Sequence, residues 1–119
     1  MNSKAYERAL TQVRAICLAL PETREVEAWG HPTFRAGKRM FAGFGAHETE
    51  GLTLGLKVGL DRQEELLQND RFFPTPYAAH HGWVSLHINN RTDWEEVRVL
   101  VREAYRQVAL TRMLKALDS

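Results

Sequence analysis

The sequence has 119 residues, of which 44% are hydrophobic and 26% charged, and its formal net charge is +1. This make-up excludes a disordered chain, and a net charge so close to zero falls short of the strongly basic balance of a dedicated nucleic-acid binder. The single cysteine excludes an internal disulfide framework. No apolar run approaches the roughly 18 residues of a membrane span, and the N-terminus lacks the apolar stretch of a secretory signal. We therefore expect a single domain over residues 1–119, located in the cytoplasm and not associated with a membrane.

The two ends of the chain show helical periodicity. Apolar residues recur at helical spacing over residues 3–20, and Pro21 ends this segment. The stripe predicted to be buried consists of Ala9, Leu10, Val13, Ile16, Cys17 and Leu20. Towards the C-terminus, Thr92 with Glu95 is typical of a capping box, and the amphipathic helix that follows either continues or restarts as a second piece up to Leu117. Asp61 with Glu64 predicts a short helix in the same way.

Between these helices the apolar period changes to two, which indicates strands. The predicted strands cover residues 25–29, 33–36, 39–44, 52–58 and 83–88. Residues 70–82, with two prolines, are predicted to form an irregular connection. Strands joined by short turns favour an antiparallel sheet with helices on one face. The predicted fold is therefore a two-layer α+β fold with the element order α-β-β-β-β-α-β-α.

Three basic residues gather where the second and third strands turn. Arg35, Lys38 and Arg39 surround Gly37, and residues 28–47 contain no acidic side chain. Basic side chains on a protruding hairpin can contact phosphate groups of a nucleic acid. They can equally be solvated charges that keep a sheet edge from aggregating.

The register of this hairpin stays open at the level of sequence. A two-residue turn pairs Phe34 with Phe41, whereas a three-residue turn pairs Phe34 with Met40. The second alternative would place Arg35 and Arg39 together on the solvent face.

No set of residues has the spacing of a catalytic or metal site. Cys17 lies in the apolar stripe of the first helix, where a thiol is structural and not reactive. Ser85 lacks the flanking glycines of a nucleophile elbow. The histidines have no matching ligand spacing; they are His31, His47, His80, His81 and His87. We expect no enzymatic activity, no metal and no cofactor.

Six short segments together form a recognisable combination of motifs. They are Leu20-Pro21-Glu22, Trp29-Gly30-His31-Pro32-Thr33-Phe34-Arg35, Gly37-Lys38-Arg39-Met40-Phe41-Ala42, Phe72-Phe73-Pro74-Thr75-Pro76-Tyr77, His81-Gly82-Trp83-Val84 and Asp93-Trp94. In this order they span nearly the whole chain, which resembles the MmcQ/YjbR family of small bacterial proteins. The resemblance implies a secretion-chaperone-like, double-wing shape with two projecting β elements. It also implies DNA binding without enzymatic activity.

The family's polar positions are carried over to this chain as expected DNA contacts. They are His31, Arg35, Lys38 and Arg39 on the first wing, and His81 and Trp83 on the second. Arg35, Lys38 and Arg39 are expected to contact phosphates, and the other three to flank the groove. Relatives often carry Lys or Arg where this chain has His81, so a phosphate contact there depends on pH.

Two other functions stay open. A protein-interaction or chaperone-like module would dock a protein partner on the sheet edge or on Phe72, Phe73 and Tyr77, although these aromatics can also plug the core. A small-molecule binder or enzyme would use a cleft near His31, His80 and His81.

Overall fold

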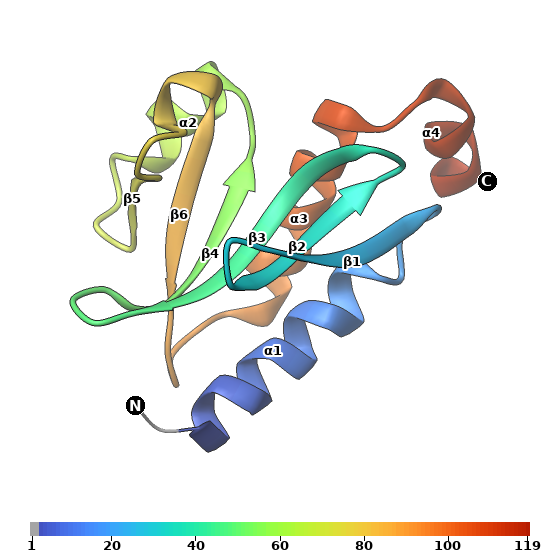
Figure 1. Cartoon of the computed structure of the whole chain (residues 1–119). Coiled ribbons are helices and arrows are strands. Elements are labelled where there is room, and N and C mark those ends of the chain that lie inside the picture. Colours follow the sequence, from blue (N-terminus) through green and yellow to red (C-terminus); the bar gives the residue numbers. More distant parts are fainter. Residues whose placement is uncertain (1–2) are drawn as a thin grey trace.

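The computed structural model describes residues 3–119, so the first two residues of the predicted domain lie outside it. The helices and strands are, in chain order, α1 (Ser3–Cys17), β1 (Thr23–Ala28), β2 (His31–Ala36), β3 (Arg39–His47), β4 (Gly51–Lys57), α2 (Leu60–Leu66), β5 (Phe72–Pro74), the 3-10 helix η1 (Ala79–His81), β6 (Trp83–Ile88), α3 (Trp94–Val108) and α4 (Thr111–Asp118). The strands form one sheet in the order β1-β2-β3-β4-β6-β5, and every neighbouring pair is antiparallel. Figure 1 shows α1 and α3 against one face of this sheet. The predicted two-layer α+β fold is confirmed.

The core lies between the helices and the sheet. Alternation in β4 directs Leu54 and Leu56 towards the helices, and both are fully buried. All six residues of the predicted apolar stripe are buried, from Ala9 to Leu20, although α1 itself ends at Cys17. Burial raises the pKa of the Cys17 thiol, which leaves it protonated and unreactive.

Two predicted helix caps are wrong. The carboxylate of Asp93, and not Thr92, caps α3, because it accepts hydrogen bonds from the N–H groups of Glu95 and Glu96. The Thr92 hydroxyl accepts from the Asn89 N–H at 2.8 Å, in the turn before the helix. Similarly, α2 follows Gly59 without a side-chain cap, which places Asp61 inside its first turn.

The predicted element order lacks β5 and η1, which lie inside the stretch predicted to be irregular. Strand β5 has three residues including Pro74 and pairs with β6 at the outer edge of the sheet. So short a strand shows no readable alternation. The C-terminal helix restarts as α4, because Ala109 is extended (ψ 144°) and ends α3.

The β2–β3 hairpin has a register that neither alternative predicted. Ala36 pairs with Arg39 across a two-residue turn, but a β-bulge follows, so Phe34 pairs with Ala42. Opposed residues share a face of the sheet; Arg39 therefore shares the face of the buried Ala36, while Arg35 shares that of Met40. Arg35 and Arg39 leave the hairpin on opposite faces and not together.

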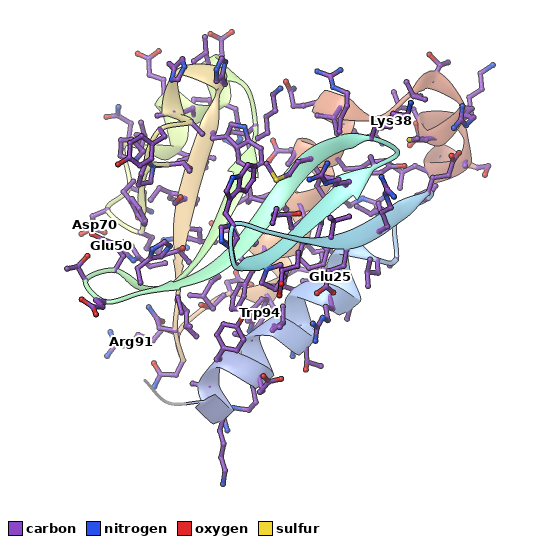
Figure 2. The ribbon with its side chains drawn as sticks, in the orientation of Figure 1. Glu25, Lys38, Glu50, Asp70, Arg91 and Trp94 are labelled. Carbon is purple, nitrogen blue, oxygen red and sulfur yellow. The ribbon has the colours of Figure 1, made fainter. Side chains whose placement is uncertain are left out.

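The tip of this hairpin is not a free projection. A Cβ atom on Gly37 would lie 3.0 Å from Cε of Met113, so the turn packs against α4. Figure 2 shows Lys38 at the tip beside α4. The turn that carries the basic residues is therefore anchored to α4, while the side chains of Lys38 and Arg39 are exposed.

Candidate functional site on the open face of the sheet

The face of the sheet opposite the helices, called here the open face, has a floor of small residues. Consecutive cross-strand partners from β2 to β6 form this floor: Thr33, Gly43, Gly55 and Ser85. No side chain rises from the two glycines. The result is a groove of about 690 Å³, within the range of ligand-binding pockets.

Two of the predicted site residues, His31 and Trp83, each lie over one glycine of this floor. A Cβ atom on Gly43 would lie 3.9 Å from Nε2 of His31, and one on Gly55 would lie 3.8 Å from Cε3 of Trp83. Trp83 is 9% exposed, so it forms part of the groove lining and does not project from the surface. Both rings therefore shape the groove from the inside.

Trp29 stands at one end of the groove in a backbone conformation unusual for its type. It forms a two-residue turn with Gly30 between β1 and β2, and both residues have positive φ, 54° and 81°. These angles are typical of a type I′ turn, whose first central position favours Asn. The side chain is nevertheless 78% exposed, so the strain is not compensated by burial.

Tyr77 shows the same combination at the other end, beyond β5. It follows Pro76 with a φ of 65°, and the Ala78 N–H donates a hydrogen bond to the Thr75 carbonyl at 3.2 Å. This is the pattern of a type II turn, which favours Gly where Tyr77 stands. The tyrosine is 100% exposed, so the interpretation of Tyr77 as a core plug is wrong. Phe72 is buried in the core, and Phe73 lines the groove.

Cations lie near one end of the groove without lining it. Arg35 is the cross-strand partner of Met40, and Lys57 that of Trp83; both partners line the groove. Arg24 lies directly opposite Arg35 on β1. These three residues, with Lys38 at the hairpin tip, are called here the basic corner.

No residue of the basic corner forms an ion pair within residues 3–119. Elsewhere arginines do pair with carboxylates: Arg14, Arg62, Arg71, Arg98, Arg106 and Arg112. Nε of Arg35 is moreover buried without a hydrogen-bond partner in the described part of the chain. The basic corner thus has donors available for an anion.

The opposite end of the open face is acidic and aromatic. Figure 2 shows Glu50 far from Lys38, at the turn that joins β3 to β4. The Glu50 carboxylate lies 3.4 Å from Nε2 of His87, whose ring packs on Phe73 with centroids 4.7 Å apart. The open face is therefore polarised along its strands.

His81 does not join the other predicted site residues. It is exposed in η1, its ring lies 4.0 Å from that of His80, and neither lines the groove that contains His31. The groove is thus not the cleft suggested near His31, His80 and His81, because of these three only His31 lines it. Across residues 3–119 no three His, Cys, Asp or Glu side chains gather as they would around a metal ion.

The sequence analysis did not place Arg24, Lys57 or Trp29 among the site residues, and it named Tyr77 only as a docking residue for a protein partner or as a core plug. Arg24 and Lys57 reach Arg35 only through strand pairing. The available signal for the aromatics was a Trp-Gly and a Pro-Tyr pair at turn positions that favour Asn or Gly.

The fold and this face define a small α+β protein whose open sheet face carries a groove and is basic at one corner. A family model described as YjbR matches residues 18–107, and the chain belongs to the YjbR family. A crystal structure of the Deinococcus radiodurans protein DR2400, which has a DUF419 domain, is similar with a TM-score of 0.74 and 25% sequence identity. That similarity covers 92% of this chain and 87% of DR2400. No curated protein matches the chain. None of the helices in residues 3–119 combines the length and the apolar character needed to cross a membrane.

Proposed function

We propose that this protein binds DNA without enzymatic activity and that the basic corner holds the phosphates. The observation that carries the proposal is the Arg24–Arg35 pair. Like charges directly opposite each other on neighbouring strands are destabilising, and no carboxylate in residues 3–119 pairs with either arginine. Nε of Arg24 donates instead to the Gly37 carbonyl at 3.3 Å. A phosphate between them would remove the repulsion and provide acceptors for both guanidinium groups.

The predicted phosphate contacts are thereby redistributed. Arg35 and Lys38 stay in the contact surface, Arg24 and Lys57 join it, and Arg39 adds positive charge from the other side of the tip. The net charge of +1 limits the attraction to this corner. A DNA partner also implies that the protein works in the cytoplasm.

The test is fluorescence anisotropy with labelled duplex and single-stranded DNA over a series of salt concentrations. Four phosphate contacts predict a log–log slope of about −3.6 on duplex DNA. The variant Arg24→Gln/Arg35→Gln/Lys57→Gln should lose most of the affinity and flatten the slope. The matched control removes the same charge from exposed arginines elsewhere: Arg8→Gln, Arg91→Gln and Arg102→Gln.

Equal losses in the two triple variants would mean that only net charge matters, and the assignment to the basic corner would be wrong. Absence of binding at low salt would refute DNA binding itself. The alternative, a protein-interaction module, is supported by the exposed Trp29 and Tyr77, since aromatic residues are enriched at interfaces. This alternative predicts that a protein partner co-purifies in stoichiometric amount, that the complex persists after nuclease treatment, and that Tyr77→Gly abolishes it.

A further inference from the structure

We infer that the groove of the open face binds single-stranded nucleic acid, with unpaired bases stacked on Trp29 and Tyr77. This inference rests on the proposed function and adds the form of nucleic acid that is held. It also assigns a binding role to two residues that lie outside the basic corner.

The floor of the groove suits a flat ring. Gly43 and Gly55 are direct cross-strand partners in the middle of the sheet, and neither covers its backbone with a side chain. Glycine inside a strand costs stability, and it is typical of places where a ligand approaches the backbone closely. The rings of His31 and Trp83 lie where side chains at Gly43 and Gly55 would stand, and the flanking Thr33 and Ser85 are 0% and 4% exposed. A base that enters the groove would therefore stack on these rings above the floor.

The two end residues carry strain without a structural benefit. Trp29 and Tyr77 both have positive φ, at turn positions where Asn or Gly would be relaxed. Neither gains burial in exchange, since they are 78% and 100% exposed. Backbone strain of this kind is concentrated at functional sites. Exposed aromatics are the residues on which single-stranded nucleic acids stack their bases, with little dependence on sequence.

The charge beside the groove identifies the occupant. Arg35 and Lys57 flank the same side of the glycine floor, two strands apart, which is about 10 Å. No lysine or arginine of residues 3–119 lines the groove itself, and its acidic lining residue is Glu50. Trp29 precedes β2, Arg35 lies near the other end of that strand, and Lys57 is the cross-strand partner of Trp83. A strand that stacks on Trp29 and Tyr77 would therefore meet the two cations with phosphates on its outer side, away from Glu50. Duplex DNA offers the phosphates but not the rings, because its bases are paired and stacked on one another.

The experiment compares three labelled probes by anisotropy: an oligothymidylate, an abasic strand of the same length, and a duplex. Trp29→Asn and Tyr77→Gly place favoured residues in their turns, so both variants should fold. Each should weaken oligothymidylate binding at least about fivefold and leave duplex binding unchanged. Leu60→Ala, which alters an exposed leucine outside the groove, is the matched control and should have no effect. Tryptophan emission should be quenched by oligothymidylate in the wild type, and less so in Trp29→Asn.

Three outcomes would overturn the inference. Equal affinity for the abasic strand and the oligothymidylate, or unchanged binding in both aromatic variants, would refute base stacking and leave phosphate binding intact. Absence of binding to all three probes by the wild type would refute the proposed function as well.

Discussion

The hydroxyl of Tyr105 on α3 donates a hydrogen bond to the backbone carbonyl of Pro21 at 2.7 Å, and the two residues are 84 positions apart. The tyrosine ring is fully buried and meets Phe41 edge to face, with centroids 5.7 Å apart. A single side chain thus connects the segment after α1, the helix α3 and the bulged strand β3.

Tyr105→Phe should lower the free energy of unfolding by about 1 to 1.5 kcal/mol, because the Pro21 carbonyl loses its donor. Urea denaturation measures the loss, and DNA binding should not change. Burial also raises the pKa of Tyr105, so its neutral form is favoured in the folded state. Part of the wild-type stability should therefore be lost above pH 10, a loss that the Phe variant shows less strongly. An equally stable Phe variant would contradict this account.

Trp29→Asn should stabilise the fold by about 1 kcal/mol, because Asn tolerates the positive φ of this turn position and Trp does not. Thermal unfolding checks the gain. The same variant weakens single-strand binding in the experiment above, so stability and affinity should change in opposite directions. A less stable variant would show that Trp29 packs against the sheet and carries no strain.

Gly43→Ala and Gly55→Ala should both fold. Their new Cβ atoms would meet neighbours no closer than 3.7 Å, which is ordinary van der Waals contact. Alanine in a strand should add about 0.5 kcal/mol of stability in each case. The double variant nevertheless raises the groove floor, so its affinity for single-stranded DNA should fall while its melting temperature does not. Unchanged affinity would mean that the ligand does not approach the floor.

Gly82→Ala should cost about 2 kcal/mol or more. Its φ is +83°, and a Cβ atom there would lie 2.8 Å from Cα of Gly59, where the two backbones are hydrogen-bonded. Gly51→Ala is the matched control, since its φ is +72° but the space around it is open. The difference between their free energies of unfolding, measured by urea denaturation, gives the cost of the steric clash alone. Equal losses of stability in the two variants would show that the backbone near Gly59 shifts to remove the clash.

The Glu22–Arg112 ion pair should make part of the stability pH-dependent. Arg112 donates to the Glu22 carboxylate at 2.8 and 2.9 Å and holds the pKa of that carboxyl below its ordinary value. The folded state therefore binds fewer protons than the unfolded state. The stabilisation is present above the unfolded pKa of about 4.3 and is lost as the pH falls through the folded pKa.

Arg112→Gln should accordingly lower the melting temperature at pH 7 and match the wild type near pH 3. Lys115→Gln removes the same charge from α4 and serves as the control. A gap that persists at acid pH would indicate a packing role for Arg112.

The sequence predicted helices and strands correctly where their apolar periodicity extends over many residues. The apolar stripe of α1 and the alternation of β4 and β6 each predict a buried face, and these residues are buried. Strand β5 was not readable, because three residues with a proline have no period and are ordered only by pairing with β6. The bulge in β3 was also unreadable, since it arises where packing draws both Phe41 and Ala42 into the core.

The site was predicted in part. Arg35, His31 and Trp83 do lie on the open face, where the sheet topology brings the strands β2 and β6 into one surface. Arg24 and Lys57 were missed because only strand pairing reveals their distance from Arg35. For Tyr77 the sequence left two alternatives, a docking surface or a core plug, because large aromatics usually lie in the core; its strained turn instead holds it in solvent.

The bulge has a consequence for changes in chain length. Strict alternation would put Met40 and Gly43, three positions apart, on opposite sides, yet both line the groove. Phe41 is the surplus residue that brings them back into phase while it fills the core beside Tyr105. Deleting Phe41 would leave a regular strand with every other side chain facing as before. Deleting Gly43 with the bulge kept in place would instead turn the rest of the strand over, directing Gly45 towards the helices and Phe44 into the groove.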